Sequence, residues 1–147
     1  MKKCSLILVV LIGLVTGVNA QMSSAAAVGT KAFEILQGLS NTSQQQFSNY
    51  FLPAKQIMEK RGADTAELND YYPKLYNELL KRGISWSKIE FVSFKAGVLD
   101  KDNTSKSGIL VFSYLNTEYY VKLSYFFYNS KYYLVTILRL AVYPYQD

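Results

Sequence analysis

Two polar side chains near the middle of the chain have the spacing of a serine acyl-enzyme. Ser85 and Lys88 form an S-x-x-K pattern around Trp86. That chemistry needs its serine at the start of a helix, with further Ser-Asp-Asn and Lys-Thr-Gly elements, whereas Ser85 follows a predicted helix and leads into a predicted strand. We therefore interpret Trp86 as a core residue that closes one end of the hydrophobic interior, and Lys88 as a solvated side chain.

The composition excludes most other nucleophile and metal chemistry. The sequence contains no histidine and a single cysteine, Cys4, so Ser-His and Cys-His pairs cannot activate a nucleophile and imidazole metal ligands are missing. Asp100, Asp102 and Asn103 form the best group of oxygen ligands, but they lack the spaced glycine and terminal glutamate of a calcium loop. We interpret them as a solvated turn, and we expect no catalytic residue, no metal site and no cofactor.

The first twenty residues have the pattern of a secretory signal peptide. Two lysines precede an apolar run over residues 6–18, which is shorter than the roughly 20 residues that a membrane-spanning helix needs. Small residues before the junction predict cleavage between Ala20 and Gln21, and a second candidate site follows Ala27. Cys4 precedes the apolar run, so we expect no lipid anchor. The pattern predicts a secreted or periplasmic protein with no stable membrane anchor after cleavage.

The remaining residues, 21–147, have a length typical of one domain and a weak positive charge. The chain has sixteen Lys and Arg and eleven Asp and Glu; Lys2 and Lys3 fall in the leader, which leaves a net charge of about +3. Acidic residues lie between the basic ones, and no arginine stripe of the kind that neutralises phosphates is present. We therefore expect no nucleic-acid partner.

The first half of this domain, about residues 23–83, has the 3.6-residue period of helices. A first helix is predicted over 23–39. A second apolar stripe runs over residues 47–58 and ends before Gly62. Pro53 lies inside this stripe and has no amide hydrogen, which predicts a kink or a split into two helices.

A third helix is predicted after Asp64. Glu67 follows three residues later, so the two side chains have the spacing of a capping box. Gly83 is suited to a left-handed cap at the end of the helix, and Pro73 predicts a kink or a late start.

From residue 87 the apolar period changes to two, which is typical of strands. Four strands are predicted, over about residues 87–99, 107–115, 118–128 and 131–143. Asn116-Thr117 and Asn129-Ser130 have the composition of two-residue hairpin turns, in which asparagine tolerates a positive φ. The sequence therefore predicts an α+β fold, with N-terminal helices packed on a four-stranded antiparallel meander.

The turns also predict which residues share a face of the sheet. If Leu115 opposes Glu118 and Tyr128 opposes Lys131, Phe112 pairs with Val121 and Leu123 pairs with Thr136. One face, the core face, then carries the following residues: Leu110, Phe112, Tyr114, Tyr119, Val121, Leu123, Tyr125, Phe127, Tyr132, Leu134, Thr136, Leu138, Leu140 and Val142. We expect helices to cover this face.

The opposite face is half apolar. This second face carries the following residues: Ile109, Val111, Ser113, Leu115, Glu118, Tyr120, Lys122, Ser124, Phe126, Tyr128, Lys131, Tyr133, Val135, Ile137, Arg139, Ala141 and Tyr143. Eleven of these seventeen residues are apolar or aromatic, whereas a solvated face normally alternates to polar residues. We expect another element or molecule to cover part of it.

Helices that lead into a four-stranded antiparallel meander resemble the cone-shaped fold of nuclear transport factors and ketosteroid isomerases, and more loosely the cystatins. The resemblance covers about residues 43–143 and consists of architecture and hydrophobic pattern, without a signature motif. The chain departs from the family because it lacks the early strands that precede the last helix. No functional residue is carried over, and the isomerase reaction is not implied.

The second face leads us to expect an exported, noncatalytic binding or interaction module. A protein partner or a second copy of the chain would cover Tyr120, Phe126, Tyr128, Tyr133 and Arg139, residue types that often anchor interfaces. The predicted register places Tyr120 opposite Arg139, a pair that allows a cation-π contact. Alternatively, a small apolar ligand would lie between the curved sheet and the helices. A purely structural cover, by the first helix or in a homodimer, is also open.

Two further hypotheses remain open at this stage. An enzyme would use a tyrosine hydroxyl and a buried carboxylate inside the cone. Every acidic residue that we can place lies in a helix, a loop or a strand end, apart from Glu90 in the first strand. An inhibitor of a secreted enzyme would instead use exposed hairpin tips, such as Asn116-Thr117.

Overall fold

The computed structural model describes residues 21–99 and 105–142 of the chain. The elements are β1 (Gln21–Met22), α1 (Ala25–Gln37), the 3-10 helix η1 (Leu39–Asn41), α2 (Gln44–Asn49), α3 (Leu52–Lys60), α4 (Ala66–Leu80), the 3-10 helix η2 (Trp86–Lys88), β2 (Glu90–Leu99), β3 (Lys106–Tyr114), β4 (Thr117–Tyr128) and β5 (Lys131–Val142). The predicted α+β class is confirmed. The three candidate calcium ligands, Asp100, Asp102 and Asn103, lie outside the described residues.

The strands form one antiparallel sheet in the order β1-β5-β4-β3-β2. The sheet has five strands, so the prediction of four strands was wrong. The additional strand is β1, which within the described residues pairs Gln21 with Tyr133 and Met22 with Tyr132. Two residues are too few to show a period of two, which is why the sequence pattern did not reveal this strand.

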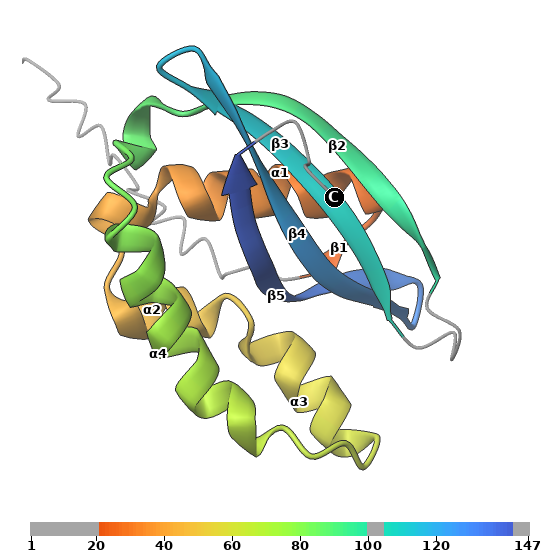
Figure 1. Cartoon of the computed structure of the whole chain (residues 1–147). Helices are drawn as coiled ribbons and strands as arrows, with labels where there is room; N and C mark the ends of the chain where they lie inside the picture. The colour runs from red at the N-terminus through yellow and green to blue at the C-terminus, as the bar shows by residue number, and fades with distance from the viewer. Residues whose placement is uncertain (1–20, 100–104, 143–147) are drawn as a thin grey trace, which may run out of the picture.

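Helix α1 lies across the core face of the sheet and contacts β2, β3 and β5 (Figure 1). The helix begins where the Ser24 hydroxyl accepts a hydrogen bond of 3.2 Å from the backbone N–H of Ala27. Its buried side chains come from the predicted stripe, for example Val28, Ala32 and Leu36. The expectation that helices cover the core face is therefore confirmed.

The second predicted helix is split into α2 and α3. Helix α2 starts with a capping box, in which Gln46 N–H donates to the Ser43 hydroxyl at 3.2 Å and Ser43 N–H donates to Gln46 Oε1 at 2.9 Å. Pro53 lies in the first turn of α3, where a proline needs no amide hydrogen. The predicted split at this proline is confirmed, and it lets α3 take a different direction from α2 (Figure 1).

Helix α4 starts in a different way from the prediction. The predicted capping box of Asp64 and Glu67 does not form, because Thr65 is the N-cap residue and Asp64 Oδ1 accepts from the Ala66 N–H at 3.0 Å. The helix continues through Pro73, and Gly83 follows its end with a φ of 70°. The left-handed conformation predicted for Gly83 is therefore confirmed.

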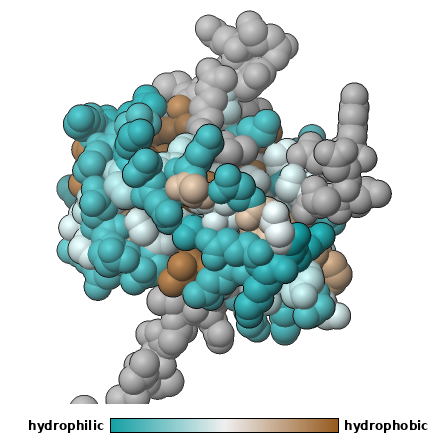
Figure 2. Space-filling view, turned by 90° about the horizontal axis from the view of Figure 1, so that it is seen from below, coloured by the Kyte–Doolittle hydropathy of each residue, from teal (hydrophilic) through white to brown (hydrophobic). Residues whose placement is uncertain are grey.

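The outer surfaces of the helices are polar. Seen from below the view of Figure 1, hydrophilic residues predominate and hydrophobic residues form only small separate spots (Figure 2). No helix in the part of the chain that the structure describes is both long and apolar enough to cross a bilayer.

The hairpin between β3 and β4 turns one residue earlier than predicted. Tyr114 pairs with Thr117, and the turn residues are Leu115 and Asn116, with φ values of 49° and 61°. The predicted pairs were therefore wrong by two residues, so that Phe112 lies opposite Tyr119. Because side chains alternate with a period of two, this shift leaves every side chain of β3 and β4 on its predicted face.

The exposed Leu115 in this turn carries backbone strain. A left-handed conformation costs roughly 1–2 kcal/mol for most side chains, whereas asparagine tolerates it. We expect Leu115→Asn to raise the free energy of unfolding by about 0.5–1 kcal/mol in urea denaturation, because the strain is relieved and no packing is lost. Leu115→Ala is the control, since it removes the same side chain without relieving the strain. Equal stability of the two variants would contradict this explanation.

Strand β5 contains two bulges that change the predicted faces. Tyr128 pairs with Lys131 as predicted, through a turn in which Asn129 and Ser130 have φ values of 47° and 62°. Farther along, Ser124 pairs with Thr136 and Leu123 pairs with Ile137. The predicted pair of Leu123 and Thr136 was wrong, because a bulge adds one residue to one strand and reverses the alternation.

The correction moves two residues between the faces of the sheet. Ile137 is fully buried in the main core, whereas it was predicted on the second face. Thr136 is buried on the second face, opposite Ser124, whereas it was predicted in the core.

A second irregularity follows farther along the two strands. Lys122 pairs with Arg139, and Val121 pairs with Leu140, whereas Leu138 was the predicted partner of Val121. Bulges increase local twist, which agrees with the strong curl of β5.

Candidate functional site

Helix α3 covers one end of the second face. Ala54 on α3 is buried in a cluster with Phe126, Tyr133 and Val135 of the sheet, and Ile57 and Met58 pack against the same cluster. The rings of Phe126 and Tyr133 stack with their centroids 5.4 Å apart. The expected partial cover therefore comes from within the chain, but from α3 and not from α1, which lies on the core face.

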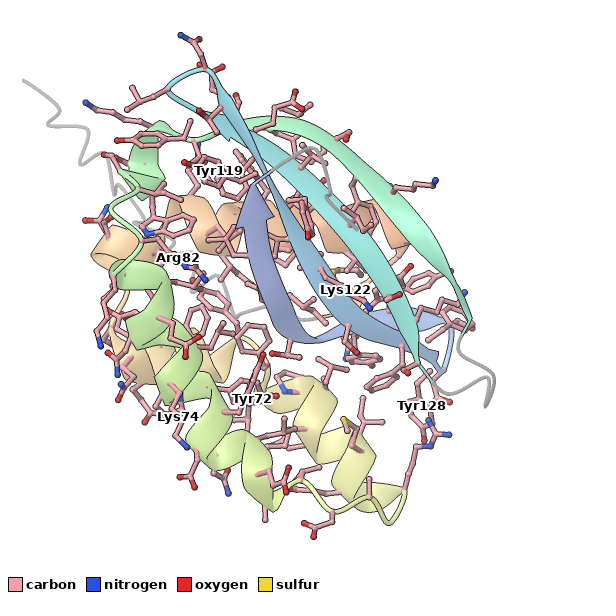
Figure 3. All side chains as sticks on the ribbon, in the orientation of Figure 1. Tyr72, Lys74, Arg82, Tyr119, Lys122 and Tyr128 are labelled. Carbon is pink, nitrogen blue, oxygen red and sulfur yellow. The ribbon has the colours of Figure 1, made fainter. Side chains whose placement is uncertain are left out.

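Two tyrosines of α4 connect this helix to strand β5. Tyr71 donates a hydrogen bond of 2.8 Å to the carbonyl oxygen of Ile137, and Tyr72 donates one of 3.0 Å to the carbonyl oxygen of Val135. Figure 3 shows Tyr72 extending from α4 toward the sheet. These bonds satisfy carbonyl groups on the edge of β5 beyond its short pairing with β1, and they shield that edge from other strands.

Burial raises the pKa of both phenols above its ordinary value. For Tyr72 the loss of hydration is the main cause, and the neighbouring Tyr71 adds to it; for Tyr71 burial is again the largest cause. Both hydroxyl groups therefore remain protonated hydrogen-bond donors at neutral pH. Tyr71 and Tyr72 therefore act as structural links between α4 and β5.

A pocket of about 500 Å³ lies where α3 ends over the second face. Its described lining consists of Met58, Arg61, Gly62, Ala63, Ser105, Ser124, Phe126 and Val135. Gly62 has a φ of 85°, which lets the chain leave the helix, and the Ala63 N–H donates to the Met58 carbonyl oxygen at 3.0 Å. The helix therefore stops short of Ser124, and the space beside Phe126 stays open.

The loop that follows α3 is fixed by a small polar network. Glu59 Oε1 accepts from the Thr65 hydroxyl at 2.6 Å and lies 3.2 Å from Lys55 Nζ. These two interactions, the Thr65 bond first, hold the pKa of Glu59 below its ordinary value. The network fixes the end of α3 to the start of α4, and it therefore positions the intervening Arg61 and Gly62 at the pocket.

Arg61 is the cationic group of the pocket. Its guanidinium carbon lies 5.7 Å from the centroid of the Tyr128 ring, a distance suited to a cation-π contact. Figure 3 shows Tyr128 at the hairpin end of the sheet, to the right of α3. Among the described residues, ion pairs join Lys31 to Glu34 and Lys55 to Glu59, and no carboxylate pairs with Arg61.

The five residues predicted as a binding surface lie in different surroundings. Phe126 lines the pocket, and the ring of Tyr133 stacks against the ring of Phe126. Tyr128 is partly exposed, and its ring lies beneath Arg61. Tyr120 is buried and pairs with Ala141, so its predicted pairing with Arg139 was wrong. The backbone of Arg139 lies opposite Lys122, and its side chain is outside what the structure describes.

Sequence reasoning missed the contribution of α3. Arg61 was not singled out, and Met58 was assigned to one apolar stripe over residues 47–58. The signal that could have identified them is the break at Pro53, after which Ala54, Ile57 and Met58 form a short stripe of their own. That second stripe needs a second apolar surface, and the half-apolar second face is the one that the sequence offers.

The serine and lysine of the acyl-enzyme pattern do not form a site. Ser85 precedes the single turn η2, and Lys88 is exposed at the end of that turn. Trp86 between them is buried, with its ring centroid 5.9 Å from that of Phe112. The interpretation of Trp86 as a core residue and of Lys88 as a solvated side chain is confirmed.

Comparison with known proteins gave no relative from which a function could be inferred. A scan against protein-family models, a search of curated proteins and a search of solved structures found no match for the chain. The resemblance to the cone-shaped fold family therefore stays a prediction from the hydrophobic pattern, and the functional proposal rests on the pocket itself.

Proposed function

We propose that the protein is an exported, noncatalytic binding module that takes its ligand in the pocket between the end of α3 and the second face of the sheet. Export is supported by the leader pattern of the first twenty residues. The binding role is supported by one observation above all, the pocket of about 500 Å³ beside Phe126.

The pocket has the size and composition of a small-molecule site. Such sites usually measure about 300–1,000 Å³ and combine an apolar lining with a few polar groups. Here Met58, Phe126 and Val135 supply apolar surface, and Ser124 and Arg61 supply polar groups. The pocket is held by α3, which packs on the sheet through a buried cluster, so the binding site is largely formed before a ligand arrives.

The noncatalytic part of the proposal is supported by the available groups. Acid-base chemistry needs a titratable group near the substrate, with a pKa close to the working pH. The described lining contains no carboxylate, histidine, lysine or tyrosine, and Arg61 is its one charged side chain. The tyrosine hydroxyls of α4 are engaged in hydrogen bonds, those of Tyr71 and Tyr72 to β5 and that of Tyr76 to the carbonyl oxygen of Thr42.

Binding in this pocket can be tested with the neutral fluorescent probe N-phenyl-1-naphthylamine. We expect saturable binding to the purified protein, and we expect Ser124→Phe to weaken it about tenfold or more, because a ring at this position occupies the pocket; each tenfold corresponds to about 1.4 kcal/mol. The measurement is a fluorescence titration, with circular dichroism to verify the fold.

The matched control is Ser113→Phe. Ser113 also lies on the second face, but it pairs with Glu118 near the opposite end of the strands. The control variant should bind the probe like the wild type. Unchanged affinity of the Ser124→Phe variant, or equal loss in both variants, would contradict the proposed site.

A further inference from the structure

We infer that the ligand of this pocket is an organic carboxylate with an apolar body, an inference that rests on the proposed binding function. The apolar body lies against Phe126, Val135 and Met58, and the carboxylate pairs with the guanidinium group of Arg61. The inference assigns a ligand class to the pocket and a specificity-determining role to Arg61.

The first observation is the contact that Arg61 makes with the ring of Tyr128. A guanidinium group that is attracted to an aromatic ring spends none of its N–H groups on an oxygen acceptor there, so these donors remain for a carboxylate, which they can bind in a bidentate way. The guanidinium carbon of Arg61 lies 5.7 Å from the centroid of the Tyr128 ring, within the range of a cation-π contact. The ring also holds the side chain in place, which lowers the entropy that is lost when a ligand binds.

The second observation concerns Glu59 and Asp64, the two acidic residues that lie closest to Arg61 in the chain. Glu59 is bound by Lys55 at 3.2 Å and by the Thr65 hydroxyl at 2.6 Å. Asp64 accepts from the backbone of Ala66 at 3.0 Å. Neither of these two carboxylates forms an ion pair with Arg61. A cation at a pocket whose described lining has no acidic group favours an anion and disfavours a cationic ligand.

The third observation is the apolar part of the pocket lining. Phe126 and Val135 belong to a cluster that is buried under α3, and they present a fixed apolar surface. Met58 lies beside them with a flexible thioether, a side chain that adapts to differently shaped apolar groups. An inorganic anion would leave this surface unused, whereas a carboxylate with an aliphatic or aromatic body uses both parts of the pocket.

The experiment compares octanoate, octan-1-ol and octylamine, which share one apolar chain and differ in charge. We expect octanoate to bind the wild-type protein about tenfold or more tighter than octan-1-ol in calorimetric titrations, which is the effect expected of a charge-assisted hydrogen-bonded pair. Octylamine should bind most weakly. Arg61→Gln should reduce the affinity for octanoate to that for octan-1-ol, without changing the affinity for octan-1-ol.

Two further variants separate charge from structure. Arg61→Lys keeps the charge and should keep part of the preference for octanoate. Lys60→Gln removes the neighbouring charge at the end of α3 and should keep the full preference. Equal affinities of the wild type for octanoate and octan-1-ol, or an unchanged preference in Arg61→Gln, would overturn the assigned ligand class.

These outcomes are distinguishable from failure of the site itself. If the neutral probe binds and Ser124→Phe blocks it while octanoate shows no advantage, the pocket is a binding site but the carboxylate assignment is wrong. If Ser124→Phe affects neither the probe nor octanoate, both proposals are wrong.

Discussion

Replacing Leu123 by alanine should lower the free energy of unfolding by about 2–5 kcal/mol, because the side chain is fully buried and its loss leaves a cavity. Leu123 lies in β4, between Gly108 of β3 and Ile137 of β5. The ring of Phe94 already lies over Gly108, and its movement could close the cavity only in part. Urea denaturation followed by circular dichroism measures the difference.

The control for this prediction is the next residue. Lys122 is exposed on the opposite face of the same strand, and Lys122→Ala should change the free energy of unfolding by less than about 0.5 kcal/mol. Similar losses in the two variants would show that β4 does not present alternate residues to the two faces in the way described.

Replacing Gly29 by alanine should destabilise the protein by about 1–3 kcal/mol, although alanine is normally the better helix residue by about 1 kcal/mol. Gly29 lies in α1, where the helix meets β2. A Cβ atom at this position would lie 2.6 Å from Phe94 Cβ and would overlap the ring. The same ring covers Gly108, whose Cβ would lie 2.7 Å from it. Phe94 therefore occupies the space that two glycines leave open.

Two comparisons test this explanation. Thr30→Ala changes an exposed residue of the same helix and should leave stability unchanged or slightly raised. In a Phe94→Leu background, Gly29→Ala should cost less than in the wild type, because the smaller side chain gives the new methyl group room. Gly29→Ala that stabilises the protein in thermal or urea denaturation would contradict the close packing of α1 on β2.

The sequence predicted those features that depend on local periodicity. The faces of β3 and β4 were correct although the turn was misplaced, because an error of two residues preserves the alternation that puts Phe112 and Val121 in the core. The split at Pro53 was also predictable, since it follows from the missing amide hydrogen. The assignment of residues to a face stays correct when the predicted ends of a strand are wrong by an even number of residues.

The remaining features depend on tertiary packing. The bulges of β5 bring Ile137 into the core, but the run from Leu134 to Leu140 alternates equally well without them. The position of α3 on the second face can be inferred only if the split at Pro53 is taken into account, because Ile57 and Met58 by themselves would suit either face. Arg61 was therefore missed as a site residue, since its importance arises from where α3 ends.

The most direct test of the binding site is an NMR titration of the ¹⁵N-labelled protein with octanoate. The described pocket predicts that the largest amide shift changes occur at Arg61, Gly62, Ser124 and Phe126, with small changes along α1 on the core face. Shift changes that concentrate at Ala32 and Leu36 of α1, or the absence of any change at saturating octanoate, would contradict a ligand site between α3 and the second face.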